Sequence, residues 1–125
     1  MQRPLTRSGV LLALAIIMRT PDGSWTKVNI EPTALRAVDV YYSSGLAENA
    51  SAVRHKTFGR ETLERLEELW GGRGFELTKV KTDLGCVRTR TWWLESGGQK
   101  RTVCHNQELR RRLDRIQSVV QLLMR

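Results

Sequence analysis

DLGCVRTRTWWLESGG, residues 83–98, is the stretch that decides the fold predicted for this chain. Within it, residues 86–94 combine β-branched, aromatic and basic side chains, a composition typical of a long strand. The Ser-Gly-Gly at 96–98 favours a tight turn, and residues 100–104 would return as a second strand. The stretch therefore predicts a β-hairpin with a basic strand surface.

Two amphipathic helices are predicted, one before this hairpin and one after it. Residues 60–70 repeat leucine at three-residue steps and end in Trp70, and Gly71 supplies a left-handed stop. After the hairpin, Asn106 can cap a final helix whose first turn holds Glu108. The apolar stripe of that helix is Leu109, Leu113, Ile116, Val120 and Leu123. Four arginines of the helix lie largely off this stripe. They are Arg110, Arg111, Arg112 and Arg115.

The remaining chain predicts further strands and turns. Strands are expected at 25–30, 38–42, 52–58 and 75–82, with a turn at 21–23 and a break at 43–45. This order predicts an α+β fold, a small antiparallel sheet with helices packed on one face. A chain of 125 residues is expected to form a single domain, 1–125.

The N-terminal region contains an apolar run, residues 10–18, between arginines at 3, 7 and 19. It resembles the start of a signal peptide, but no small-x-small cleavage site follows, and the run is too short to span a bilayer. We expect a buried helix or strand of the core and no membrane partner. The alternative is a membrane-targeting segment, in which case residues 1–24 would be a separate N-terminal apolar segment.

The charge balance points to a polyanionic partner. Twenty-one Lys and Arg against thirteen Asp and Glu give a net charge of +8 and a pI near 10.3. Such a surplus favours nucleic acid or an acidic membrane surface. A basic protein that is merely soluble is the alternative.

Catalytic motifs are not found. The sequence has no Gly-rich phosphate loop, no GxSxG and no HExxH, so we expect no enzyme, no cofactor and no small-molecule substrate. The acidic residues of the first helix are expected to form a solvated face with i,i+4 ion pairs. These are Glu61, Glu64, Glu67 and Glu68.

The two cysteines are expected to be free thiols in a reducing compartment. If Cys86 and Cys104 lie on the two strands of the hairpin, they are too far out of register for a disulfide. Together with His55 and His105 they lack the close paired spacing of a zinc module, so no metal site is expected.

A nucleic-acid surface is predicted on the strands. One face of residues 86–94 would carry Arg88, Arg90 and Trp92, and the other Thr89, Thr91 and Trp93. Arg and Thr side chains can contact phosphates and ribose hydroxyls without reading bases, which is how duplex RNA is mostly recognised. A solvated amphipathic strand is the alternative. The expected backbone contacts are Arg54, Lys56, Arg60, Arg88, Thr89, Arg90 and Thr91.

Several of these stretches together resemble a known family. ETLERL at 61–66, Trp70 and Gly72, LGC at 84–86, the Ser-Gly-Gly at 96–98 and the Leu-rich final helix resemble the nineteen-kilodalton RNA-silencing suppressors of tombusviruses. The length is closer to the fourteen-kilodalton suppressors of aureusviruses, and the resemblance covers residues 52–125.

The resemblance implies a homodimer whose two small sheets join into one concave surface. That surface would hold double-stranded RNA, small interfering RNA and longer duplexes, without reading sequence, in the cytoplasm of a host plant cell. GSWT at 23–26 is similar to the family's end-stacking segment, so Trp25 joins the expected RNA contacts. The family's second tryptophan position is Val28 here, so weak length selection is expected.

Two other functions are left open. Trp70-Gly71 could bind a host silencing protein, since a Trp-Gly dipeptide can bind Argonaute, although a core tryptophan followed by a capping glycine has the same pattern. A small basic ribosome-associated or inhibitor-type α+β protein would also fit the order of elements.

Overall fold

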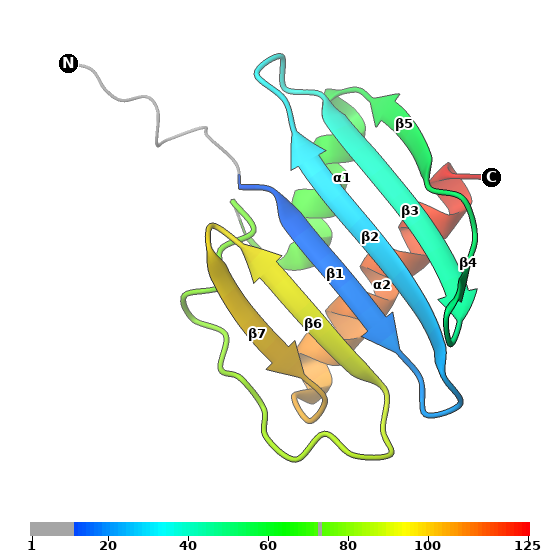
Figure 1. Cartoon of the computed structure of the whole chain (residues 1–125). Helices are drawn as coiled ribbons and strands as arrows, with labels where there is room; N and C mark the ends of the chain where they lie inside the picture. Colours follow the sequence, from blue (N-terminus) through cyan, green and yellow to red (C-terminus); the bar gives the residue numbers. More distant parts are fainter. Residues whose placement is uncertain (1–11, 73) are drawn as a thin grey trace.

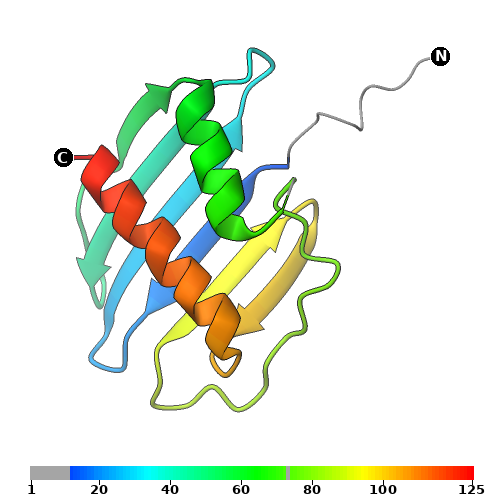
Figure 2. The ribbon, with the colours of Figure 1, turned by 180° about the vertical axis from the view of Figure 1, so that it is seen from behind.

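The computed structural model describes residues 12–72 and 74–125 (Figure 1). The strands are β1 (Leu14–Arg19), β2 (Ser24–Pro32), β3 (Val38–Leu46), β4 (Asn49–Ala50), β5 (Arg54–Phe58), β6 (Thr91–Ser96) and β7 (Gln99–Val103). The helices are α1 (Arg60–Trp70) and α2 (Gln107–Leu123). The predicted α+β class is confirmed, with one antiparallel sheet and both helices on the same face of it (Figure 2).

The sheet places the apolar N-terminal run at its centre. The strand order is β4-β3-β2-β1-β6-β7, and β5 also pairs with β3. Because β1 pairs with β2 on one side and β6 on the other, the apolar run supplies the central strand. The described residues before position 25 therefore belong to the sheet and not to a separate segment. The part of that prediction that falls on residues 1–11 lies outside the described residues.

Alternation along the strands builds the core between sheet and helices. In β1, Leu14, Ile16 and Met18 are buried while Ile17 and Arg19 are exposed, as the two-residue period of a strand requires. The other strands add buried residues on the same face, and each fully buried apolar side chain contributes about 1.5–3 kcal/mol. They are Val28, Ile30, Val38, Val40, Tyr42, Trp92, Leu94 and Val103.

Helix α1 begins and ends where the sequence predicts, and α2 begins at the predicted cap. Gly71 closes α1 in the left-handed region (φ 98°), and its amide donates to the carbonyls of Glu67 and Glu68. Asn106 caps α2 by accepting the Leu109 amide on its side-chain oxygen at 3.0 Å. Leucines of both helices lie in the core, so each helix packs its apolar stripe on the sheet.

Three strand predictions are wrong. The break expected at 43–45 does not occur, because β3 runs on to Leu46 in register with β2. Gly45 lies opposite Trp25, and a Cβ at this glycine would overlap the Asn49 carbonyl oxygen and come within 2.7 Å of the Trp25 ring. The glycine therefore makes room for the chain of β4 and for the indole, and it does not end the strand.

The other two errors concern the long connection between α1 and β6. Residues 75–82, all described, contain no strand, since Gly74 (φ 77°) and Phe75 (φ 51°) turn the chain there. The strand predicted from residue 86 begins only at Thr91, because Gly85 (φ 71°) and Arg88 (φ 58°) also have left-handed conformations. Such conformations do not fit a strand.

Candidate nucleic-acid interface

The predicted RNA contacts on β5 have a different role. Arg54 and Lys56 point to the helix side of the sheet, where they reach the C-terminal end of α2. The Arg54 guanidinium donates to the Met124 carbonyl at 2.9 Å, and the Lys56 ammonium donates to the carbonyls of Leu123 (3.3 Å) and Arg125 (3.0 Å). These carbonyls have no partner within the helix, and a cation is stabilising at that end of the helix dipole. The two side chains therefore cap α2, and because both are exposed their contact with RNA stays a prediction.

Trp25 and Arg60 are separated from the other expected contacts. The Trp25 indole lies against Gly45 on the face of the sheet away from the helices, and its N–H donates to the Ala47 carbonyl at 2.9 Å. Arg60 is the exposed first residue of α1, on the helix side. These contacts hold the Trp25 ring against the sheet, and stacking on the end of a duplex would require them to break.

The Arg/Thr stretch lies in a loop and not on a strand. Arg88, Thr89 and Arg90 precede β6, so the predicted alternation of faces does not apply to them. Thr91 is 4% exposed and its hydroxyl donates to the Thr89 carbonyl at 3.1 Å, so it is not available to ribose. Arg88 and Arg90 are exposed, and only they and Thr89 remain as candidates from this stretch.

The prediction of two free thiols is wrong. Cys86 and Cys104 form a disulfide with a Cα–Cα distance of 5.8 Å, inside the usual range of about 4.4–6.8 Å. The prediction assumed that residues 86–90 extend β6. Instead, the loop passes outside β7 (Figure 1), and the Asp83 amide donates to the Thr102 carbonyl at 2.7 Å. This path brings Cys86 to the far side of β7, next to Cys104.

Five arginines lie on this loop and on α2, and we call them the arginine surface. They are Arg88, Arg90, Arg110, Arg111 and Arg115. Arg90 donates to the Asp114 carboxylate at 3.0 Å, which ties the loop to the helix. The guanidinium carbons of Arg90 and Arg110 each lie 5.8 Å from the centroid of the Trp92 ring. The surface thus combines two segments that are separate in the sequence.

The excess of positive charge is larger on the arginine surface than on helix α1 or on the sheet. Asp114 pairs with Arg90, Glu108 pairs with Arg112 at 2.6 Å one turn from Arg111, and Arg88, Arg111 and Arg115 are exposed. Helix α1 carries four glutamates against Arg60 and Arg65, so it is acidic. The sequence did contain a signal for the helical part, because arginines at 110–112 and 115 fall off the apolar stripe. The approach of the loop to α2 had no such signal.

The sheet face away from the helices is electrically balanced. The strand registers place Arg19, Lys27 and Lys100 on it together with Glu31, Asp39 and Glu95. Trp93 and Ile17 are neighbours there and are 40% and 36% exposed. A face with equal numbers of acids and bases attracts a phosphate backbone weakly, so the sheet is a poorer match to a polyanion than the arginine surface.

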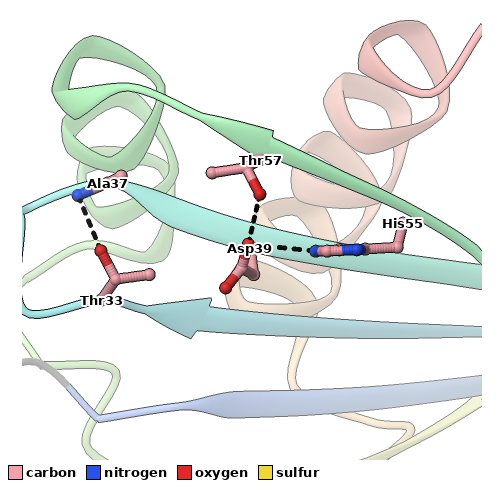
Figure 3. Close-up of polar contacts among 5 residues, drawn as sticks. All are labelled: Thr33, Ala37, Asp39, His55 and Thr57. Carbon is pink, nitrogen blue, oxygen red and sulfur yellow. Dashed lines mark hydrogen bonds and ion pairs between the residues drawn. The ribbon is translucent and has the colours of Figure 1, made fainter.

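One exposed polar cluster on the balanced face forms its hydrogen bonds within itself (Figure 3). The Asp39 carboxylate accepts hydrogen bonds from the Thr57 hydroxyl and, at 3.0 Å, from His55 Nε2. The bond from Thr57, followed by that from His55, lowers the pKa of Asp39. The His55 ring also stacks on Tyr41, with ring centroids 4.3 Å apart. These groups satisfy one another across β3 and β5, so the cluster supports strand pairing.

Trp70 belongs to the core. Its side chain is 6% exposed and lies 6.3 Å from the Phe75 ring, centroid to centroid. The Trp70 carbonyl accepts a hydrogen bond from Arg112 at 3.1 Å, which links the end of α1 to α2. In this fold the indole is covered by the protein and is not presented to a partner.

No protein-family model, no curated protein and no solved structure matches this chain. The resemblance to the tombusvirus suppressors therefore rests on the sequence motifs alone. Within residues 12–72 and 74–125, neither helix is long and apolar enough to cross a membrane.

Proposed function

We propose that this protein binds double-stranded RNA through the arginine surface, without reading sequence. The observation that carries the proposal is that Arg90 of the loop pairs with Asp114 of α2 and lies over the Trp92 ring together with Arg110, which joins the loop arginines to the arginine-rich helix. Guanidinium groups bind phosphate oxygens in a bidentate manner, and such contacts hold a nucleic acid without distinguishing bases.

The distribution of charge supports this location over the sheet. A polyanion is attracted to the place where cations exceed acids, and neither α1 nor the balanced face of the sheet offers such a surplus. Three of the residues expected from the sequence, Arg88, Thr89 and Arg90, lie at the proposed surface. The preference for RNA over DNA rests on the resemblance, since A-form shape and 2′-hydroxyls are what such a protein would sense.

The biological role in this proposal is suppression of RNA silencing. A protein that covers RNA duplexes withholds them from the silencing machinery of a host cell, and the resemblance further implies a homodimer. The proposed location in the host cytoplasm sets a condition on the redox state of the two cysteines. Disulfides are typical of oxidising compartments, so in the cytoplasm the protein would work with Cys86 and Cys104 reduced.

The experiment that tests the proposal compares ligands and surfaces. Fluorescence anisotropy titrations with duplex RNA, single-stranded RNA and duplex DNA should show the tightest binding for duplex RNA, with affinity falling steeply as salt rises. Equal affinity for all three would leave only nonspecific attraction. A flat salt response would favour a protein partner instead, as expected for an inhibitor-type protein.

Two double variants locate the surface. Arg111→Ala with Arg115→Ala should weaken duplex binding and reduce the magnitude of the salt slope by about 1 for each phosphate that the variant no longer neutralises. Arg60→Ala with Arg65→Ala changes the net charge equally on the acidic helix α1, so it is the matched control and should bind as the wild type. Equal weakening in both variants would show that net charge alone drives binding.

A further inference from the structure

We propose that Cys86, Cys104 and His105 form a redox-controlled zinc site, which takes Zn²⁺ when the disulfide is reduced. The two sulfur atoms and a ring nitrogen of His105 lie within 4.8 Å of one another, although the residues come from segments on opposite sides of β6 and β7 in the sequence. Thiolate sulfur and imidazole nitrogen are the ligands that Zn²⁺ prefers. This inference does not depend on RNA binding.

The imidazole is already prepared for a metal. His105 Nε2 lies 3.0 Å from the Leu84 carbonyl oxygen, which can only accept a hydrogen bond. In the neutral ring Nε2 therefore carries the proton, and the proposal assigns the metal to Nδ1, which keeps its lone pair. Zinc-binding histidines usually donate their other ring N–H to a carbonyl or carboxylate in this way, which fixes the ring and its tautomer.

The two halves of the site are held together by bonds other than the disulfide. The Asp83 carboxylate accepts the backbone amides of Cys104 and His105, both at 2.8 Å, and the Asp83 amide donates to the Thr102 carbonyl. These contacts fix the segment that carries Cys86 against the end of β7. The three ligands therefore stay close together when the sulfur–sulfur bond is opened.

The geometry fits a small rearrangement. In a tetrahedral site with Zn–S bonds of about 2.3 Å, the two sulfur atoms lie roughly 3.8 Å apart. Opening the disulfide lets the sulfurs separate to this distance by side-chain rotation, since the Cα atoms are 5.8 Å apart. The chain then supplies three ligands, and the fourth position is left to water. His105 is exposed and Cys86 is half-buried, so an ion has access.

The disulfide is replaced by zinc in two steps, reduction and metal binding. A dithiol reductant gives two electrons and two protons to the Cys86–Cys104 bond and becomes a disulfide itself, leaving two thiols on the protein. Zn²⁺ then replaces the two thiol protons and binds both thiolates and the imidazole nitrogen. In a reducing compartment, the metal would thus join the loop to β7 in place of the covalent bond.

Cobalt(II) provides the direct test on the full chain. Protein reduced with a phosphine, which offers no thiolates of its own, should bind Co²⁺ with a thiolate-to-cobalt charge-transfer band and the visible bands of four-coordinate cobalt. Zn²⁺ should then remove both signals by displacement. The oxidised protein should show neither signal. A reduced, folded protein without the charge-transfer band would overturn the proposal.

The histidine distinguishes this site from a simple pair of thiols. His105→Ala should weaken Co²⁺ binding at least about tenfold and change the visible bands, because an imidazole ligand is removed. His55→Ala removes the other histidine, away from the cluster, and is the matched control with an unchanged spectrum. If His105→Ala leaves the spectrum and affinity unchanged, the proposed ligand set is wrong.

A second measurement needs no substitution. In the reduced wild-type protein, Zn²⁺ should slow the alkylation of both Cys86 and Cys104 by iodoacetamide, as mass spectrometry of the peptides can follow. Equal alkylation rates with and without zinc would contradict the site even if a cysteine variant failed to fold.

Discussion

At the scale of single residues, two cations that look like ligand-binding groups in the sequence serve the fold. Arg54 and Lys56 donate hydrogen bonds to carbonyls at the end of α2, which is far from β5 in the sequence. An alternating basic strand gives no information about which helix end lies above it. Their role could be assigned only once the diagonal path of α2 across the sheet was known (Figure 2).

Replacing both Arg54 and Lys56 by alanine should lower the free energy of unfolding by about 0.6–2 kcal/mol, because each cation near a helix C-terminus contributes about 0.3–1 kcal/mol. Duplex RNA affinity should stay unchanged, since neither residue belongs to the arginine surface. Urea unfolding and anisotropy titration check the two expectations. Loss of RNA affinity in a folded double variant would return β5 to the binding site.

Asp83 predicts a pH dependence of stability. Hydrogen bonds from the Cys104 amide, and then the His105 amide, lower the pKa of this carboxyl below its ordinary value of 3.8. Its stabilising contribution is therefore present above about pH 3.8 and is lost as pH falls through the lower folded-state pKa. In urea unfolding series below pH 4, Asp83→Asn should lose less stability on acidification than the wild type does. Parallel pH curves would show that Asp83 does not contribute.

At the scale of elements, Trp70 joins α1 to the core. Trp70→Ala should destabilise the protein by about 3–5 kcal/mol through the cavity it leaves, as thermal or urea unfolding can measure. Any loss of activity should then follow the unfolded fraction. A stable Trp70→Ala protein that binds duplex RNA but no longer suppresses silencing would instead support Argonaute binding through Trp70-Gly71.

The elements also show how far sequence reasoning extends. The bounds of α1 and the cap of α2 were predictable because their signals, Gly71 and Asn106, are local. Gly45 was misread as a strand break because the groups that need the space, the Asn49 carbonyl and the Trp25 ring, lie on other strands. The disulfide was missed for the same kind of reason. Cys86 and Cys104 meet only because residues 75–90 leave the sheet, and no local sequence signal predicts that path.

At the scale of the whole molecule, the sheet has one covered and one uncovered face, and the charge surplus lies on the helix side. Among the described residues, the exposed Trp93 and the Trp25 indole lie on the opposite face of the sheet and Trp92 is buried, so the arginine surface presents no tryptophan to cap a duplex. The surface would contact the phosphate backbone anywhere along a duplex.

Competition between short and long RNA duplexes should therefore show little preference for either, once affinity is expressed per binding site. The same titration on Trp25→Ala should give an unchanged length profile if the variant is folded. A sharp optimum at one length in the wild type, abolished in Trp25→Ala, would show that this tryptophan measures the duplex.

The central position of β1 has a consequence for how the chain is made. While the chain emerges from the ribosome, β1 can pair with β2 at once, but its other edge must wait for β6, which is synthesised only after α1 and the long loop. Until then an apolar strand edge stays open, and such edges invite pairing with other chains. The nascent protein should therefore depend on chaperones until the residues of β6 have been translated.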